Sequence, residues 1–153
     1  MCGLAGELRF DGRPADADAV RRMLPALASR GPDGEGFFER GPVAFLKAYH
    51  RWGSSCVKRF LGMFAFAILS HESSEVVLAR DRLGVKPLYL AGAPGRLRFA
   101  STLPALLAAG DVDTSIDKVA LQHYMTFHSV VPAPRTILSG VRKLPPATIR
   151  FRS

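Results

Sequence analysis

Residues 62–81, GMFAFAILSHESSEVVLARD, predict a β-hairpin in the middle of the chain. Two apolar runs flank the polar turn HESS, and the first run is apolar at successive positions instead of alternating with polar ones. Strands with this pattern are typically covered on both faces. The first strand of the hairpin is therefore expected to be buried on both sides.

Further strands and helices are predicted on both sides of this hairpin. A second hairpin is expected at residues 86–101, where KPLYLAG and RLRFAS flank the turn APG. Short helices are expected at residues 103–110, LPALLAAG, and at residues 117–127, DKVALQHYMTF. Residues 4–10, LAGELRF, predict a strand that ends at the turn sequence DGRP. Adjacent antiparallel strands combined with helices predict a mixed α and β fold.

A helix is expected after the first strand, because apolar residues recur with helical spacing from Val20 to Leu27. Asp16 or Asp18 can cap its N-terminus. Pro25 would cost about 3 kcal/mol in a helix interior, so the helix should kink or end near that residue.

Another helix is expected at residues 45–53, FLKAYHRWG. Phe45, Tyr49 and Trp52 fall on one helical face, and Gly53 is a plausible C-cap. An aromatic stripe at this spacing predicts core packing.

The composition is that of one ordinary globular domain. A chain of 153 residues buries about 68–70% of its unfolded surface on folding. No apolar run approaches the length of about 18 residues that indicates a membrane span. Glu7 and Arg9 interrupt the region where a signal peptide would be apolar, and two cysteines are too few for a disulfide scaffold. A cytoplasmic protein with Cys56 in its core is expected.

The net charge of +8 suggests an anionic partner, but the 21 basic residues are dispersed in runs no longer than a pair. No nucleic-acid recognition motif accompanies them, so nucleic-acid binding is not expected. The four histidines lack the spacing of zinc ligands, and no G-x-S-x-G elbow is present. Neither a metal site nor a serine hydrolase is predicted.

Cys2 directly follows the initiator methionine, and two interpretations of it are open. It can be a small apolar residue at the start of the first strand, because Cys is among the most buried residue types. If Met1 is removed, Cys2 carries both a thiol and a free α-amine. Their ordinary pKa values are about 8.5 and about 7.7–8.0, so the amine can act as base for its own thiol near neutral pH. Cys2 is therefore the candidate nucleophile.

Several stretches, taken in order, resemble the N-terminal glutaminase domain of class II glutamine amidotransferases, and in particular the asparagine synthetase family. They are MCGLAG, RGPDGEG, LGMFAFAI, LARDRLGVKPLYL, FAS and VRKLPPAT. LKAYHRWG, FASTLPALL and FHSVVPAPRTILSGVRKLPPAT are most similar to the branch that includes N-acetylglutaminylglutamine amidotransferase. The resemblance implies an α+β fold, an Ntn-hydrolase-like αββα sandwich of antiparallel sheets. It also implies that Cys2 attacks the side-chain amide of L-glutamine, giving a γ-glutamyl thioester and ammonia, after which water releases glutamate.

The resemblance also assigns residues outside the N-terminus. Arg30, Gly31 and Asp33 match a loop that flanks the glutamine pocket in the family. The alternative is a structural turn in which Arg30 and Asp33 pair locally.

In the stretch RDRLGVKP a structural role is expected. Arg80 and Asp81 should fix the end of a strand, and Gly84 should form a turn.

Relatives carry several dozen residues at the point where Ala44 runs directly into Phe45 in this chain. By resemblance, that stretch holds the glutamine clamp and the oxyanion donors, so these residues are unknown here and the sandwich is incomplete as written. Loss of one oxyanion donor alone costs about 2.7–4 kcal/mol, or about 100- to 1000-fold in rate. Two explanations stay open: a real deletion, or a segment that the sequence omits.

Residues 1–130 are expected to form the internally truncated glutaminase domain, and residues 131–153 a Pro-rich connection toward a synthetase domain. By resemblance, ATP and magnesium belong to that absent domain and no cofactor is expected in this chain. The expected partners are L-glutamine and the synthetase domain, in cis in relatives or in trans here, and a homodimer is also considered. The alternative function is a catalytically inactive module that acts by binding, if at all.

Overall fold

The computed structural model describes residues 3–30, 49, 51–69 and 76–152. The chain divides into two compact units. Unit 1 comprises Met1–Glu35 and Pro87–Pro145, and unit 2 comprises Gly36–Lys86 and Pro146–Ser153. Each unit contains one antiparallel sheet.

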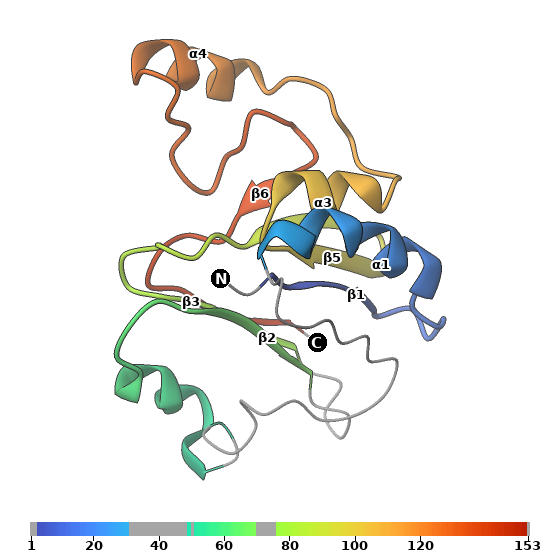
Figure 1. Ribbon diagram of the computed structural model, residues 1–153, viewed down its shortest axis with the longest axis vertical. Helices are drawn as coiled ribbons and strands as arrows, with labels where there is room; N and C mark the ends of the chain where they lie inside the picture. Colours follow the sequence, from blue (N-terminus) through green and yellow to red (C-terminus); the bar gives the residue numbers. More distant parts are fainter. Residues whose placement is uncertain (1–2, 31–48, 50, 70–75, 153) are drawn as a thin grey trace. The chain divides into compact units, whose positions relative to one another are not determined.

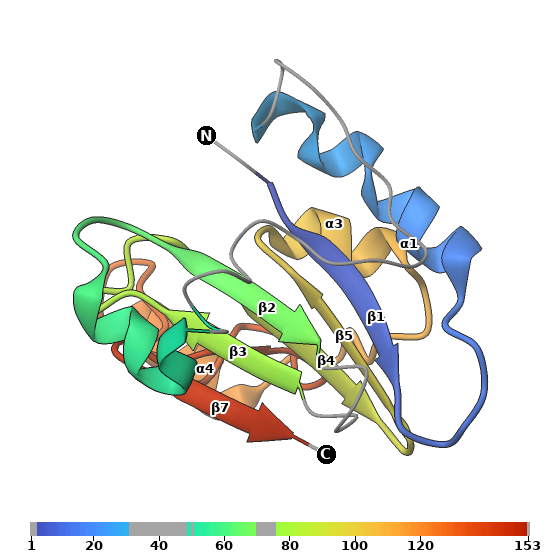
Figure 2. The same cartoon turned by 90° about the horizontal axis from the view of Figure 1, so that it is seen from below.

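The sheet of unit 1 has the strand order β1-β5-β4-β6. Its strands are β1 (Ala5–Arg9), β5 (Arg96–Ala100), β4 (Tyr89–Ala93) and the short β6 (Arg142–Lys143). Figure 2 shows β1, β5 and β4 side by side. The predicted first strand and second hairpin are therefore confirmed, and the turn of the hairpin contains Gly95 with a φ of 65°.

Two helices of unit 1 lie over one face of this sheet (Figure 1). Helix α1 (Ala17–Met23) starts at Asp16, whose side chain accepts from the N–H of Ala19 at 2.9 Å. Helix α1 ends at Met23, and the 3-10 helix η1 (Pro25–Arg30) begins at Pro25. This agrees with the expected end of the helix near Pro25, because proline has no N–H to donate. Helix α3 (Leu103–Ala108) is capped by Thr102.

The core of unit 1 is formed where these helices meet the sheet. Its buried residues from the helices and the connecting turns include Ala19, Met23, Leu27, Ala105 and Leu106. They pack with residues that share one face of the strands, among them Ala91 and Ala100. On the opposite face Leu90, Leu97 and Phe99 are also buried, so the sheet is covered on both sides.

Unit 2 holds the hairpin predicted from residues 62–81 (Figure 2). Strand β2 (Ala65–Leu69) pairs with β3 (Val76–Arg80), and β7 (Ile149–Arg152) pairs with the other side of β3. The turn HESS lies outside the described residues. The pairing of β2 with β3 confirms the hairpin.

Burial in this sheet differs from the expectation in one respect. Every residue of β3 is buried, whereas among residues 65–68 of β2 Phe66 and Ile68 are buried and Ala65 and Ala67 are partly exposed. Within the described part of the sheet, β2 has a single neighbour, and its small alanines face the less covered side. The strand that is buried on both faces is therefore β3.

The predicted helix at residues 45–53 is described only at its end. Tyr49 packs against the cluster around Phe66, as expected for a core aromatic residue. Trp52 is 38% exposed, so the predicted core stripe is wrong for this residue. The guanidinium groups of Arg51 and Arg59 lie 5.4 and 4.8 Å from its ring centroid, an arrangement that stabilises a partly exposed indole. Phe45 lies outside the described residues.

The chain leaves this helix through Gly53, whose φ of 55° is that of a C-capping glycine. The 3-10 helix η2 (Gly53–Arg59) follows. It buries Cys56 to 1% exposure, which confirms the expected core position of this thiol. Burial raises the pKa of Cys56 above its ordinary value.

The structure has an α+β fold with two antiparallel sheets, as predicted. The predicted junction between Ala44 and Phe45 lies outside the described residues. The division into residues 1–130 and 131–153 stays a prediction. The latter range contributes β6 and β7, in agreement with the extended form expected for the Pro-rich tail. No helix within the described ranges has the length and hydropathy needed to cross a membrane.

Asp81 organises the turn after β3. It is 2% exposed, and its carboxylate accepts three backbone N–H groups at 2.9–3.2 Å, those of Leu83, Val85 and Lys86. Burial raises the pKa of Asp81, but donation from Lys86, Val85 and Leu83 lowers it by more, so that the pKa lies below its ordinary value.

Arg80 and Gly84 complete this turn. The Arg80 guanidinium donates to the carbonyl oxygens of Lys86 at 2.9 Å and of Gly84 at 2.5 Å. Gly84 has a φ of 65°, and a Cβ there would lie 2.7 Å from Pro146. The structural role predicted for RDRLGVKP is confirmed.

Replacement of Asp81 by alanine should lower the free energy of unfolding at pH 7 by about 2–4 kcal/mol, because three backbone donors lose their acceptor. The pKa of Asp81 is lower in the folded state than in the unfolded chain. Its contribution is therefore complete above the unfolded value of about 3.9 and is lost as the pH falls through the folded value. Urea denaturation across this pH range measures the free energy of unfolding of wild type and of Asp81→Ala. The difference between these two free energies should become smaller below about pH 4.

Asp18→Asn is the matched control, because Asp18 is exposed and forms a surface ion pair with Arg21 at 2.9 Å. It should change stability by less than about 1 kcal/mol. A difference between wild type and Asp81→Ala that stays constant from pH 7 to pH 2.5 would contradict the assigned role of the ionised carboxylate.

Candidate functional site

The predicted site lies partly outside the described residues. Cys2, Gly31 and Asp33 belong to the segments that the structure does not describe, and of Arg30 it gives the backbone at the end of η1. The described chain begins at Gly3. The structure does describe the segments next to the predicted nucleophile and loop, which begin at Gly3 and end at Arg30.

The segment that leads to Cys2 is held by Ser101. The N–H of Leu4 donates to Ser101 Oγ at 3.0 Å, and the N–H of Ser101 donates to the carbonyl oxygen of Leu4 at 2.7 Å. Ser101 is buried, directly follows β5 and is the last residue of the FAS stretch. These two hydrogen bonds extend the β1–β5 pairing to within two residues of Cys2.

The same segment contacts the helix that precedes the predicted loop. A Cβ on Gly3 would lie 3.0 Å from Cβ of Leu27, closer than most side chains tolerate. Leu27 is buried in η1, three residues before Arg30. The structure therefore brings the residue after Cys2 against the helix that leads into RGPDGEG, and a side chain at position 3 would crowd Leu27.

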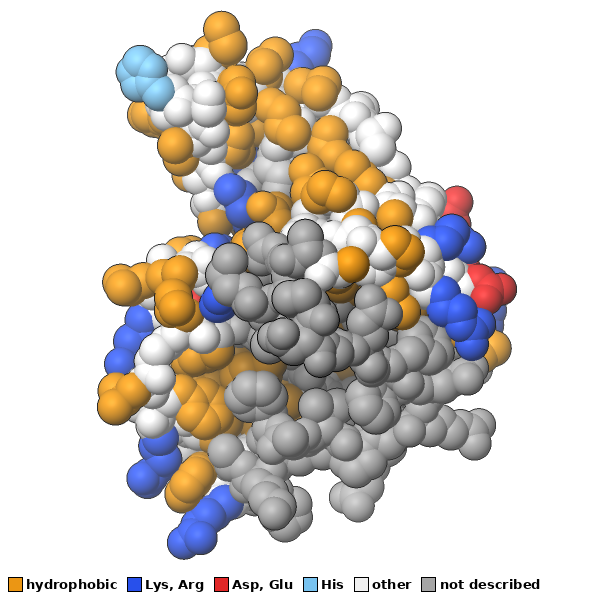
Figure 3. Space-filling view, viewed as in Figure 1, with side chains coloured by type: hydrophobic (Ala, Val, Ile, Leu, Met, Phe, Trp, Pro, Cys, Tyr) orange, Lys and Arg blue, Asp and Glu red, His pale blue; other side chains and the backbone are white. Residues whose placement is uncertain are grey.

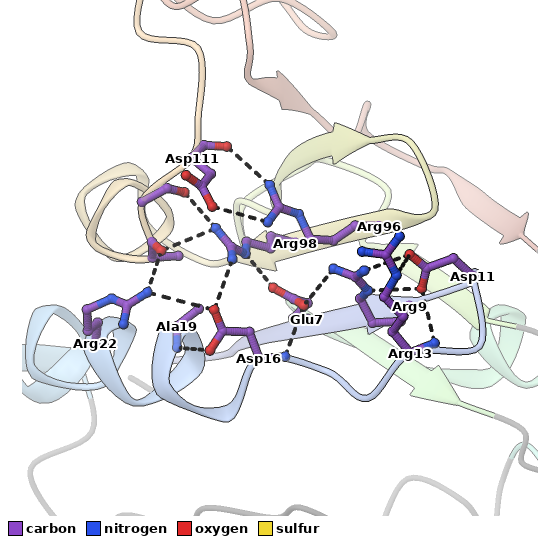
Figure 4. Close-up of polar contacts among 12 residues, drawn as sticks. Glu7, Arg9, Asp11, Arg13, Asp16, Ala19, Arg22, Arg96, Arg98 and Asp111 are labelled. Carbon is purple, nitrogen blue, oxygen red and sulfur yellow. Dashed lines mark hydrogen bonds and ion pairs between the residues drawn. The ribbon is translucent and has the colours of Figure 1, made fainter.

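A buried ion pair fixes β1 below this segment (Figure 4). Glu7 lies opposite Arg98 in the β1–β5 register, and Arg98 Nε donates to Glu7 Oε2 at 2.5 Å. Both side chains are almost fully buried. Charged groups are found in such surroundings when they are paired and hydrogen-bonded, so the two strands are joined by their side chains as well as by their backbones.

The ion pair also holds both helices. Arg98 Nη1 donates to the carbonyl oxygens of Ala109 and Gly110, at 3.2 and 2.6 Å, just after α3. Glu7 Oε1 accepts from the N–H of Asp16, the cap of α1, at 3.1 Å. The guanidinium thereby satisfies carbonyl groups that a helix end leaves without partners. One ion pair connects β1, β5, α1 and α3.

Asp16 adds a further charge to this network. Its carboxylate lies 3.7 Å from Arg98 Nη2 and 3.9 Å from Arg22 Nη2. Donation from the N–H of Ala19 lowers its pKa, burial opposes this, and the charges of Arg22 and Arg98 lower it further. The network holds structure in place and contains no nucleophile. No group of three or more potential metal ligands occurs among the residues that the structure describes.

Glu7, Arg98 and Ser101 are the residues of this frame that the sequence patterns did not single out. FAS was part of the family resemblance, which was the available signal for Ser101. The ion pair gave a weaker signal in the sequence. Glu7 stands two positions after Ala5, and Arg98 stands two positions before Ala100, so in a strand each charged residue shares a face with a small apolar one.

Arg98→Met should lower the free energy of unfolding by about 3–5 kcal/mol, because it leaves the Glu7 carboxylate buried without its partner. The double variant Glu7→Leu/Arg98→Met should recover much of this loss. Urea denaturation at pH 7 measures both.

Arg96→Met is the matched control on the same strand. Arg96 pairs at 3.5 Å with Asp111, whose side chain is exposed, so its removal should cost less than about 1 kcal/mol. Equal losses of unfolding free energy in the Arg96 and Arg98 variants would mean that the buried ion pair contributes no more to stability than the pair of Arg96 with Asp111.

Comparison with known proteins finds several similar relatives, among them the following three. A putative glutamine-hydrolyzing asparagine synthetase of Mycobacterium tuberculosis is 39% identical over 130 residues, which are 83% of this chain and 19% of the relative. Glutamine-hydrolyzing asparagine synthetase 1 of Bacillus subtilis is 37% identical over 103 residues, 67% of this chain and 16% of the relative. Asparagine synthetase 3 of the same organism is 30% identical over 140 residues, 90% of this chain and 22% of the relative.

The chain thus spans about a fifth of the length of these curated relatives. The family profile of the glutamine amidotransferase domain matches residues 43–152. This range includes the hairpin of unit 2, the turn at Asp81 and, in unit 1, the strands β4 and β5, of which β5 leads to Ser101. Because the match covers most of the chain, the protein belongs to the glutamine amidotransferase domain family.

Proposed function

We propose that this chain hydrolyses L-glutamine, with Cys2 as nucleophile, and supplies ammonia to an asparagine synthetase-like partner. The chain belongs to the glutamine amidotransferase domain family. Within that family, the proposal rests on the two hydrogen bonds between Leu4 and Ser101. They fix the backbone next to Cys2, and nucleophilic catalysis depends on such positioning.

The proposed chemistry needs only the protein, glutamine and water. After removal of Met1, the α-amine of Cys2 takes the thiol proton and the sulfur attacks the carboxamide carbon of glutamine. The C–N bond breaks, the nitrogen takes the proton and leaves as ammonia, and a γ-glutamyl thioester remains. Water cleaves the thioester to give glutamate and restores the thiol. A reduced compartment such as the cytoplasm suits a free thiol nucleophile.

Arg30, Gly31 and Asp33 are proposed to lie beside the glutamine pocket, as the matching loop does in the family. The contact of Gly3 with Leu27 supports this, since Leu27 lies in the helix that leads into the loop. The oxyanion donors are left unassigned. ATP and magnesium are assigned to the synthetase part of the relatives, and no cofactor is proposed for this chain.

A second candidate function has one observation in its favour. Ala44 and Phe45 are adjacent in the sequence, at the point where the family resemblance implies a stretch that holds the glutamine clamp. A chain with this deletion would be a catalytically inactive module that retains the fold and acts through binding.

The purified chain should release glutamate and ammonia from glutamine, and Cys2→Ala should reduce this to background. Mass spectrometry establishes that Met1 is absent from the sample. Cys56→Ala is the matched control, because that thiol is buried in the core of unit 2. It should retain turnover per folded molecule. No turnover in folded, methionine-free wild type would favour the inactive module.

Ser101→Ala should lower kcat/KM for glutamine by about 10- to 100-fold, because a displacement of about 1 Å at a reacting group costs up to about 100-fold. The free energy of unfolding should fall by about 1–3 kcal/mol through the lost acceptor of the Leu4 N–H. Steady-state kinetics and urea denaturation measure the two effects. Ser54→Ala, at an exposed serine, should change neither. Unchanged kinetics for Ser101→Ala would mean that this anchor does not position Cys2.

A further inference from the structure

Most of the net positive charge of the chain belongs to unit 2. This unit contains ten of the 21 Lys and Arg residues and four of the 13 Asp and Glu residues, so it carries six of the eight net positive charges. Among the described residues of unit 2 the only acidic one is Asp81, whose buried carboxylate accepts backbone N–H groups of its own turn. The described surface of unit 2 is therefore basic.

Four cations of unit 2 lie at the end of the sheet where β2 begins and β3 ends. They are the exposed residues Arg51, Lys58, Arg59 and Arg82. Arg82 Nη2 donates to the carbonyl oxygen of Lys58 at 3.2 Å, which joins the turn after β3 to η2. The guanidinium groups of Arg51 and Arg59 both lie over the ring of Trp52. Cations grouped in this way attract an anionic partner.

Exposed apolar side chains lie at the same end of this sheet. Leu61 and Met63, just before β2, are 95% and 59% exposed, and Leu83, in the turn after β3, is 85% exposed. The two segments adjoin because β2 and β3 are antiparallel, and the N–H of Asp81 donates to the carbonyl oxygen of Phe64 at 2.9 Å. Figure 3 shows hydrophobic and basic side chains next to one another on the left of the molecule, over η2 and the turn after β3.

The four cations and these apolar side chains form one surface, which is called the basic apolar surface. Its members are Arg51, Trp52, Lys58, Arg59, Leu61, Met63, Arg82 and Leu83. Singly exposed apolar residues are ordinary, but exposed leucines that adjoin a group of cations mark an interaction surface.

The charge of this surface restricts its partner. A second copy of the chain that paired through it about a twofold axis would bring identical cations face to face, which is unfavourable. A nucleic acid would satisfy the cations, but interfaces with nucleic acids are strongly polar and offer little to exposed leucines.

The apolar side chains restrict the partner further. At a protein interface the buried core is packed as closely as a protein interior, so each projecting side chain needs a matching pocket. A fluid bilayer accepts projecting side chains without such pockets. Segments that lie at a membrane surface combine Lys and Arg with Trp and Leu, as this surface does.

We propose that the basic apolar surface binds the surface of a membrane that contains anionic lipids. The cations contact the anionic headgroups, and Leu61 and Leu83 enter the apolar zone beneath them. Trp52, which is partly exposed, lies at the level of the headgroups, where tryptophan is enriched. This inference goes beyond glutamine hydrolysis, and neither activity requires the other.

Trp52 is the single tryptophan of the chain, so its fluorescence reports on this surface. Vesicles of phosphatidylcholine with about one third phosphatidylserine should shift its emission to shorter wavelength and should carry the chain with them on sedimentation. Vesicles of pure phosphatidylcholine should do neither. Raising NaCl from about 0.1 M to about 0.5 M should weaken binding at least tenfold, because the screening length becomes shorter.

Two double variants test the two kinds of side chain. Lys58→Gln/Arg82→Gln should raise the lipid concentration for half-maximal sedimentation at least tenfold, at roughly fivefold for each cation. Leu61→Ser/Leu83→Ser should raise it by at least about tenfold as well, because the apolar anchors are lost. All four side chains are exposed, so both variants should keep the circular dichroism spectrum of wild type. Each single substitution should act in the same direction.

Two double variants in unit 1 are the matched controls. Arg13→Gln/Lys118→Gln removes the same charge at exposed positions. Leu121→Ser/Met125→Ser removes apolar side chains that are 44% and 74% exposed on helix α4 (Lys118–Thr126). Both controls should bind the vesicles within twofold of wild type.

Three results would overturn the proposal. The first is equal sedimentation with and without phosphatidylserine, and the second is an equal loss of binding in the controls and in the variants of the basic apolar surface. The third is tighter binding to polyglutamate or to an oligothymidylate than to the vesicles, with no effect of the leucine replacements. That result would identify an acidic protein or a nucleic acid as the partner.

Discussion

Unit 1 depends on the ion pair between Glu7 and Arg98. A charge pair in a dry interior is no cheap source of stability, because both groups lose their hydration. It is retained here with nearly complete hydrogen bonding, since Arg98 also serves the carbonyl groups after α3 and Glu7 accepts from the cap of α1. The pair also sets the register of β1, because a slip by one residue would turn Glu7 to the opposite face of the sheet.

This register determines where the N-terminus leaves the sheet. Once Glu7 faces Arg98, Leu4 is placed beside Ser101 and forms two hydrogen bonds with it. Gly3 then meets Leu27, in a contact that a side chain at position 3 would crowd. The network therefore determines the path of the chain up to the residue that follows Cys2. The stability of unit 1 and the proposed catalysis thus both depend on the pairing of β1 with β5.

Local patterns predicted much of this fold, because the signals and their partners lie close in sequence. The hairpins, the cap at Asp16, the break at Pro25 and the turn at Gly84 follow from neighbouring residues. The Glu7–Arg98 pair could not be found this way, since its members are 91 positions apart and meet only through the β1–β5 pairing. In the site, sequence position singled out Cys2, but the anchoring role of Ser101 depends on that same distant pairing.

The helices α1 and α4 have the same N-capping chemistry and opposite surroundings. Asp16 and Asp117 each accept backbone N–H groups of the first turn, yet α1 buries Ala19 and Met23 whereas α4 buries Ala120. A helix of nine residues is marginal in water without such support. The support for α4 comes from its cap and from the arginines paired with Asp117, and the core gains little from it. The apolar side chains of α4 other than Ala120 therefore add little to the core of unit 1 and lie at its surface.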